Sequence, residues 1–268
     1  MTTRLEGSRI SPGLQTAGSY CCQMNDRTCL FCFGSNGKFA GREHIFPETV
    51  GNTDSAMLPP GIICDRCNNG PLSRLDKALC DYLPIAMRRT TLGIPNKHGN
   101  AATVRFAEGR IEPLPAHVVA SGDSHGVRLV DQNPLRPIAH SFEQNNEHVA
   151  FKIRGQGGRR LTAEYLAELS RAVLKIAFEC AYLDHGVELF ASRFDHVRGV
   201  VLGQRDHHGE IALALNGDGE DLRMQCSYML DDATGIGGAV VNVLGVVVLA
   251  HAADQPIAPT PGFFIGRF

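Results

Sequence analysis

The chain has 268 residues, of which 43% are hydrophobic and 20% are charged, a composition typical of a globular protein that can bury a substantial core. Its formal net charge of −2 gives no global attraction to nucleic acid, so any contact with DNA would need a local basic face. Nine cysteines in a chain of this length are too sparse for a disulfide scaffold.

The N-terminal segment is polar and rich in glycine and serine. It contains no apolar stretch of the kind that a secretory signal needs, and we interpret residues 1–25 as a flexible leader. Without an export signal we expect a cytoplasmic protein. In a reducing compartment, closely spaced cysteine pairs favour metal binding over disulfides.

Two CxxC pairs follow within residues 26–90, and they consist of Cys29, Cys32, Cys64 and Cys67. A two-residue gap lets both thiolates of a pair reach one ion, and two pairs supply the four sulfurs of a closed tetrahedral site. The spacing therefore predicts structural zinc. The alternatives are reduced thiols without metal or one redox CxxC, and Cys21 or Cys22 could replace a ligand.

The segment between the two pairs carries an acidic residue and a histidine side by side, Glu43 and His44. Histidine titrates near neutral pH and can act as a general base. Asn68 directly follows Cys67, the last cysteine of the pairs. The side chains of Glu43 and Asn68 offer oxygen atoms that suit a divalent ion. A divalent ion beside a base predicts phosphodiester hydrolysis. The alternatives are a loop histidine without a role and an asparagine that only caps a helix.

Leucines at helical spacing follow the second CxxC pair. The spacing from Leu72 to Leu83 predicts a helix that begins just after Cys67. Proline cannot continue a helix, so Pro84 is predicted to end it. Asp76 lies on this helix, where a charge on an exposed face is ordinarily solvated.

Residues 91–268 carry strand-like runs on either side of one long helix. The run ATVRFAEGRIEPL predicts a hairpin that turns at Glu108 and Gly109, and HVAFKIRG predicts a further strand. An apolar stripe predicts a helix from Thr162, its N-cap, to Gly186, its stop. Further strands are predicted for VRGVVLGQ, IALALN and LRMQCSYML.

The valine-rich segment GIGGAVVNVLGVVVLAHAA, which begins at Gly235, is apolar enough for a membrane span or for two buried strands. Asn242 and His251 interrupt it, and no lysine or arginine flanks it, which argues against a span. Valine favours strands and Gly245 suits a turn. We therefore predict two strands that meet at this glycine.

The combination CLFC…EHIFPE…CDRCNN resembles the HNH nucleases, also called His-Me finger or ββα-metal nucleases. It is most similar to the zinc-stapled subgroup, in which CxxC pairs bracket an acidic residue and a histidine. The resemblance covers residues 28–83, about a quarter of the chain. It implies an α+β fold with a zinc-stapled ββα-metal unit in residues 26–90, followed by a mixed α/β region with one long helix and antiparallel strands.

The resemblance also implies roles for individual residues. His44 would be the general base, Glu43 and Asn68 would bind catalytic Mg²⁺ or Mn²⁺, and the four CxxC cysteines would hold structural zinc. Asp76 matches the LD pair of the small bacterial subgroup and could complete the metal site. Many members carry an asparagine where this chain has Met57, and Asn52 is the nearest substitute for orienting the histidine. Asp54 or a backbone carbonyl is the alternative.

The expected function is a metal-dependent endonuclease that hydrolyses phosphodiester bonds in DNA, with RNA left open. Residues 91–268 would then bind substrate, dimerise or regulate, and no membrane association is expected. The pair Arg88 and Arg89 could contact phosphates. Family association suggests phage defence, restriction or mobile elements. The alternative is a non-catalytic zinc module on a degenerate HNH scaffold that binds nucleic acid or a protein partner.

Overall fold

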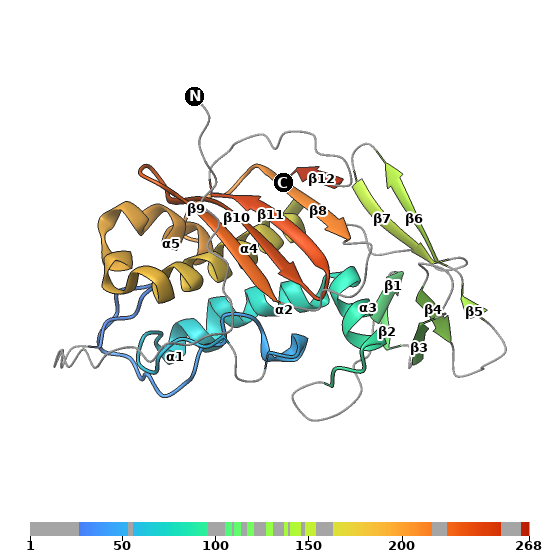
Figure 1. The fold of residues 1–268 in the computed structure, drawn as a ribbon, viewed down its shortest axis with the longest axis horizontal. Coiled ribbons are helices and arrows are strands. Elements are labelled where there is room, and N and C mark those ends of the chain that lie inside the picture. Colours follow the sequence, from blue (N-terminus) through green and yellow to red (C-terminus); the bar gives the residue numbers. More distant parts are fainter. Residues whose placement is uncertain are drawn as a thin grey trace.

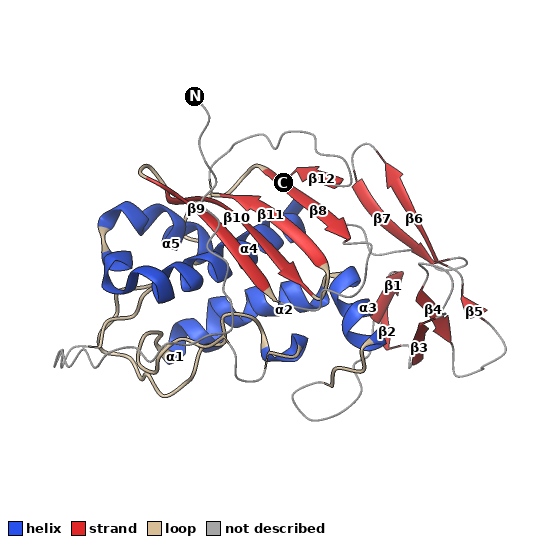
Figure 2. Cartoon of the chain, viewed as in Figure 1, coloured by secondary structure: helices blue, strands red, loops and turns tan. Residues whose placement is uncertain are grey.

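Helices and antiparallel strands form the described parts of the chain, as the sequence predicts (Figures 1 and 2). The computed structural model describes residues 27–52, 56–95, 105–108, 110–113, 117–120, 127–130, 137–138, 140–145, 148–153, 163–215, 224–252 and 264–267. The fold is α+β. None of the helices in these residues is long and apolar enough to cross a membrane. The predicted leader and most of the segments around the small sheets lie outside the described residues.

The largest sheet has five antiparallel strands in the order β12-β8-β11-β10-β9 (Figure 1). Their bounds are Glu210–Leu215 (β8), Gln225–Asp231 (β9), Gly235–Val243 (β10), Val246–His251 (β11) and Phe264–Arg267 (β12). Between β10 and β11, Leu244 and Gly245 both have positive φ, 54° and 78°. Two such residues form the tight turn that matches the twist of a hairpin. The prediction of two strands joined at Gly245 is confirmed.

Helix α4, Ala163–His185, is the longest helix and ends as predicted at Gly186, whose φ is +58°. Its predicted N-cap, Thr162, lies outside the described residues. Residues 172–181 are all buried. The helix packs against β10 and β11 on one side and contacts α2 on another, so no side of its middle faces water (Figure 1).

The helical segment after the second CxxC pair differs from the prediction. It comprises α1 (Asp65–Cys67), a π turn η2 (Asn68–Leu72), α2 (Ser73–Asp81) and α3 (Leu83–Thr91). Gly70 leaves the helical conformation and separates α1 from α2. Tyr82, with an extended ψ of 117°, ends α2, and Pro84 lies in the first turn of α3. Proline is tolerated there because the N–H groups of a first turn have no intrahelical partner.

Four short helical segments accompany these elements: η1 (Glu48–Val50), η3 (Gly186–Phe190), η4 (Ser192–Phe194) and α5 (Asp195–Val201). The strand predicted for VRGVVLGQ is wrong, because this run forms most of α5. Residues 197–201 are all buried. A run that is buried on every side has no hydrophobic period, so the sequence pattern cannot distinguish a strand from a helix.

Three small antiparallel sheets lie between α3 and α4 in the sequence. Their strands are Arg105–Glu108 (β1), Arg110–Pro113 (β2), His117–Ala120 (β3), Val127–Val130 (β4), Pro137–Ile138 (β5), His140–Asn145 (β6) and His148–Ile153 (β7). Glu108 pairs with Arg110, so the predicted β1–β2 hairpin is confirmed. The strand predicted for HVAFKIRG is also confirmed, as β7.

One buried core joins the cysteine-containing segment to α4 and the large sheet. The ring of Phe178 on α4 contacts the ring of Phe31, at 5.3 Å between centroids, and that of Phe194, at 5.9 Å. Tyr165 on α4 donates a hydrogen bond of 2.9 Å to the carbonyl of Ala78 on α2. These contacts place α4 directly against residues 27–90.

Candidate functional site

The four cysteines of the CxxC pairs come together at one point. Their Sγ atoms all lie within 4.8 Å of one another. The Sγ atoms of Cys32 and Cys64 are 3.7 Å apart. A zinc–sulfur bond of about 2.3 Å in tetrahedral geometry separates the sulfurs by about 3.8 Å. The cysteines are therefore positioned to hold a metal ion, as predicted, and the spacing is consistent with structural zinc.

The Cys67 thiol and nearby backbone N–H groups favour negative charge on Cys29, whereas burial raises the pKa of Cys32. The Cys67 thiol donates a hydrogen bond to Cys29, which lowers the pKa of Cys29 to about 4 and raises the pKa of Cys67. The N–H groups of Gly34 and Cys64 each lie 3.4 Å from a cluster sulfur, that of Cys32 and that of Cys29 respectively. Further thiolates would repel the first one, so ionisation of all four needs a bound cation.

The acidic residue and the histidine lie on one of two short extended segments that pair with each other. His44 pairs antiparallel with Met57, the residue that stands in place of the expected asparagine. On either side of this pair, the N–H of Ile45 donates to Ala56 and the N–H of Leu58 donates to the carbonyl of Glu43, both at 3.0 Å. The order along the chain is thus two paired extended segments followed by the helices of residues 65–91.

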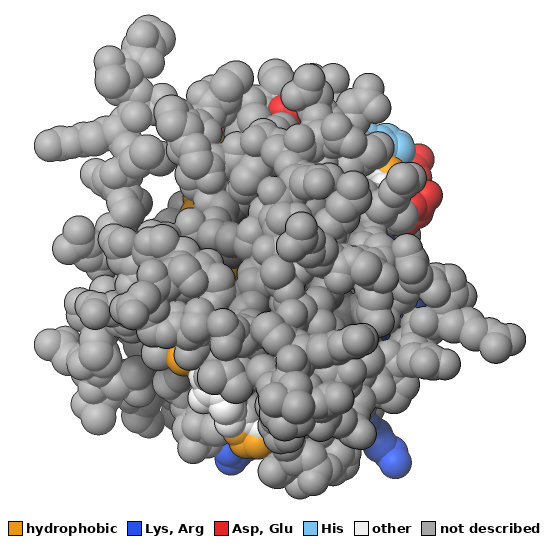
Figure 3. Space-filling model, turned by 90° about the vertical axis from the view of Figure 1, so that its right-hand side faces the viewer, with side chains coloured by type: hydrophobic (Ala, Val, Ile, Leu, Met, Phe, Trp, Pro, Cys, Tyr) orange, Lys and Arg blue, Asp and Glu red, His pale blue; other side chains and the backbone are white. Residues whose placement is uncertain are grey.

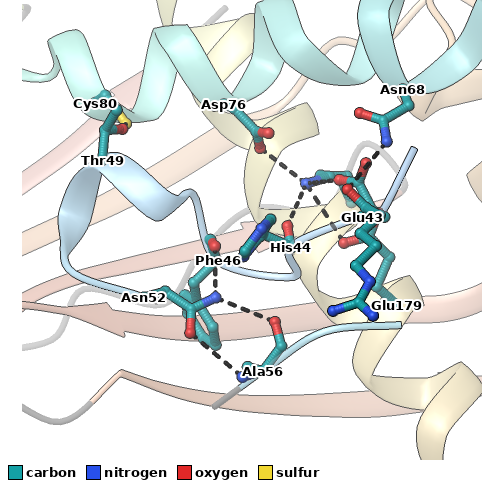
Figure 4. A network of polar contacts seen from close by, with 12 residues as sticks. Glu43, His44, Phe46, Thr49, Asn52, Ala56, Asn68, Asp76, Cys80 and Glu179 are labelled. Carbon is teal, nitrogen blue, oxygen red and sulfur yellow. Dashed lines mark hydrogen bonds and ion pairs between the residues drawn. The ribbon is translucent and has the colours of Figure 1, made fainter. Parts of the chain in front are cut away.

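Asn52 braces the loop between these two segments (Figure 4). Its amide nitrogen donates to the carbonyls of Phe46 and Ala56, at 2.7 and 3.1 Å, and its oxygen accepts from the N–H of Ala56 at 3.3 Å. The side chain is buried, so it fixes the backbone that follows His44. Asp54 lies outside the described residues. Within the described part, Nδ1 of His44 is buried without a hydrogen-bond partner.

A lysine that the sequence did not single out lies at the centre of the site. Lys175 on α4 is fully buried, and its Nζ lies 2.6 Å from Oε1 of Glu43 and 2.8 Å from Oδ1 of Asp76. The same Nζ donates to the carbonyl of His44 at 3.2 Å and lies 3.4 Å from Oε2 of Glu179. In Figure 4, dashed lines from Asp76, His44 and Glu43 meet at this nitrogen. The only hint in the sequence is that Lys175 and Glu179 interrupt the apolar run VLKIAFECA.

The Lys175 cluster, which we define as Glu43, Asp76, Lys175 and Glu179, contains three carboxyl groups and one ammonium group. Burial raises the pKa of Glu179 well above its usual range, and it raises the pKa of Glu43 against the opposing effect of Lys175. Burial alone would lower the pKa of Lys175, but the carboxyl groups of Asp76, Glu179 and Glu43 outweigh this and raise it. Lys175 is therefore charged, and Glu179 tends to keep its proton.

Asn68 contacts the backbone beside Glu43. Its amide nitrogen donates to the carbonyl of Arg42 at 3.2 Å. The residue that caps the start of the helical segment is Cys64, because α1 begins at Asp65. Asn68 thus ties the helical segment to the extended one, and its amide oxygen is not used in this bond.

Arg88 and Arg89, which could contact phosphates, each donate a hydrogen bond within the chain. Arg88 donates to the carbonyl of Leu244 and Arg89 to that of Pro95, both at 3.2 Å. The segments that carry Glu43, Asn68 and Asp76 also carry three exposed arginines, Arg42, Arg66 and Arg74. On the face drawn in Figure 3, the lysine and arginine side chains of the described residues lie at separate points.

Comparison of the chain with protein-family models, with curated proteins and with solved structures finds no match. The carboxyl groups of Glu43 and Asp76 and the carbonyl of His44 all lie next to the ammonium group of Lys175. Asn68 is hydrogen-bonded to the carbonyl of Arg42, the residue before Glu43.

Proposed function

We propose that the chain is a metal-dependent endonuclease of the HNH type that hydrolyses phosphodiester bonds in DNA. The observation that carries the proposal is a convergence at one point, the Nζ of Lys175. Glu43 reaches it at 2.6 Å, Asp76 at 2.8 Å and the carbonyl of His44 at 3.2 Å. The ammonium group of Lys175 is thus surrounded by the acidic residue, the histidine and the helix of the motif.

The chain offers residues for two kinds of metal site. The four CxxC cysteines would hold structural zinc. Glu43, Asn68 and Asp76 would hold Mg²⁺ or Mn²⁺, because carboxylate and amide oxygens suit these ions. Glu43 is buried, and its Oε1 lies 2.6 Å from Nζ of Lys175. When bound, the divalent ion would polarise the scissile phosphate and stabilise the leaving oxygen.

His44 would act as the general base. Its Nδ1 is not committed to a hydrogen bond in the described part of the chain. In the proposed step the imidazole takes a proton from water, the resulting hydroxide attacks phosphorus and the P–O ester bond breaks. The leaving oxygen then takes a proton from solvent. The exposed arginines Arg42, Arg66 and Arg74 would contact neighbouring phosphates.

Cleavage of supercoiled plasmid in Mg²⁺ or Mn²⁺ tests the proposal, with single-stranded RNA as a parallel substrate. His44→Ala should lower the cleavage rate by about 100-fold or more, the usual contribution of a general base. Zinc content should stay at one per chain, because the four clustered cysteines, and not His44, are the predicted zinc ligands. The matched control is His208→Ala, which removes an exposed histidine. Undiminished cleavage by His44→Ala would contradict the assignment.

A second candidate function is a non-catalytic zinc module on the same scaffold, which binds nucleic acid or a protein partner. The observation that favours it is the buried ion pair of Glu43 with Lys175, because a neutralised carboxylate needs no metal. Titration of the zinc-loaded protein with Mn²⁺ in a calorimeter separates the two candidates. A second divalent site supports the nuclease, and its absence together with tight DNA or protein binding supports the module.

A further inference from the structure

The ammonium group of Lys175 joins all parts of the proposed nuclease site. An ammonium has three N–H donors. Its three nearest acceptors are the Glu43 carboxylate, the His44 backbone carbonyl and the Asp76 carboxylate. The first two lie on one extended segment, and the third lies on α2. One side chain therefore fixes the extended segment and the helix relative to each other.

Folding stability alone does not call for this arrangement. Apolar residues of the same volume often stabilise a core as well as buried ions do. Here the lysine side chain is 0% exposed, and Glu179 is also 0% exposed. Neither carboxyl oxygen of Glu179 has a hydrogen-bond partner among the described residues. Such a cluster is costly for the core, but it gives the neighbouring carboxylates one defined orientation.

The contacts of Lys175 involve only one oxygen of each nearby carboxylate. Nζ contacts Oε1 of Glu43 and Oδ1 of Asp76. Across the described residues, the second oxygen of each has no ion pair or hydrogen bond. The Asp76 side chain is 26% exposed, so its carboxylate is accessible from solvent.

Resting on the proposed function, we propose that Lys175 is a positioning residue of the nuclease site. Its ammonium holds one oxygen of Glu43, one oxygen of Asp76 and the backbone of His44, and it leaves the second carboxylate oxygens for the divalent ion. Lys175 follows His44 by 131 positions, so α4 completes a site whose motif lies in residues 26–90. Groups that orient metal ligands from behind contribute about 10–100-fold to metal affinity or activity.

Lys175→Met, which keeps the length and removes the charge, tests the inference in the full-length protein. We expect Mn²⁺ affinity, measured by calorimetry on the zinc-loaded protein, to fall by about 10–100-fold, and plasmid cleavage to fall with it. Zinc content should stay at one per chain. Lys77→Met is the control, because Lys77 pairs with Asp81 on the exposed side of α2.

The outcomes separate the two proposals. A wild-type protein that binds no Mn²⁺ and cuts no DNA contradicts the proposed function, and this inference fails with it. A wild-type protein that does both, with equal Mn²⁺ affinity in Lys175→Met, overturns the inference alone. Tighter Mn²⁺ binding by Lys175→Met also overturns it, because Lys175 would then compete with the ion for Glu43 and Asp76.

Lys175→Arg covers the case in which Lys175→Met does not fold. It keeps the positive charge among the carboxylates, but a planar guanidinium cannot direct three hydrogen bonds from one nitrogen. We expect Mn²⁺ affinity between those of the wild type and Lys175→Met. Wild-type Mn²⁺ affinity and cleavage in Lys175→Arg would show that charge suffices and would overturn the positioning role.

Discussion

The cysteine cluster and the Lys175 cluster each gather four polar side chains, but the chain assembles them differently. The cysteine cluster comes from two CxxC pairs within residues 29–67, and each pair reaches the common point through one tight turn. The Lys175 cluster joins Glu43 and Asp76 to two residues of α4. The first cluster needs a bound cation to ionise all four thiols, whereas the second contains its own ammonium group. Local geometry can be predicted from spacing, and pairing across the fold cannot.

Metal removal should have the largest effect. Structural zinc contributes about 10–16 kcal/mol of apparent binding free energy in small zinc-dependent units, so its loss should unfold residues 29–67. Helix α4 also packs on the large sheet through β10 and β11, so it should persist. Hydrogen exchange after chelation measures this: amides of residues 29–67 should lose protection, while those of α4 and β8–β11 keep it.

Cys29→Ser should reproduce the effect of chelation, and Cys80→Ala, outside the cluster, should leave one zinc per chain. Uniform loss of protection over all these segments would show that the two clusters belong to one cooperative unit, and the comparison would then fail.

Phe178→Ala should have the next largest effect, because this ring joins the two regions. It is fully buried and contacts Phe31 and Phe194. Truncation of a buried phenylalanine costs about 3–5 kcal/mol of unfolding free energy. Urea unfolding measures the loss, and Leu183→Ala, on an exposed part of the same helix, is the control. A loss below about 1 kcal/mol would mean that the regions are stabilised independently.

Glu179→Gln should change how stability depends on pH. Burial raises the pKa of Glu179, so the folded state holds this proton more tightly than the unfolded state. The resulting stability is present below the ordinary glutamate pKa of about 4.3 and is lost as the pH rises toward the raised pKa. As the pH rises above about 4.3 toward the raised pKa, the wild type should lose up to about 1.4 kcal/mol per pH unit relative to Glu179→Gln.

Urea midpoints of the two proteins at several pH values check this prediction. Parallel pH profiles of wild type and Glu179→Gln would show that Glu179 ionises alike in the folded and unfolded states. The Lys175 cluster would then carry three negative charges instead of keeping one proton.

Lys77→Met should have the smallest effect. Lys77 and Asp81 form an ion pair whose side chains are 73% and 41% exposed. Exposed pairs contribute about 0–1 kcal/mol, since water and salt screen them. Thermal unfolding should therefore change little, in contrast to the buried Lys175. If Lys77→Met lost as much unfolding free energy as Phe178→Ala, the contrast between the exposed Lys77 and the buried Lys175 would not hold.

Particular residues show what the sequence could predict of the fold. The hairpin at Gly245 and the end of α4 at Gly186 were predictable, because positive φ is a local demand that glycine meets. The helix α5 was not, because the buried run VRGVV carries no period. The start of α3 at Leu83 was missed because a proline fits the first turn of a new helix as well as the end of an old one.

By itself, the sequence determined the cysteine cluster, since a two-residue gap places two thiols at one point in almost any turn. It also placed Glu43, His44 and Asn68 near one another through the CxxC pairs on both sides. Only the tertiary structure decided what these groups contact. Lys175 and Glu179 appear in the sequence as an ordinary helical pair, and the packing of α4 against both α2 and the sheet turns that pair inward. Burial then strengthens the electrostatic interactions of the Lys175 ammonium with its neighbours, because water no longer screens them.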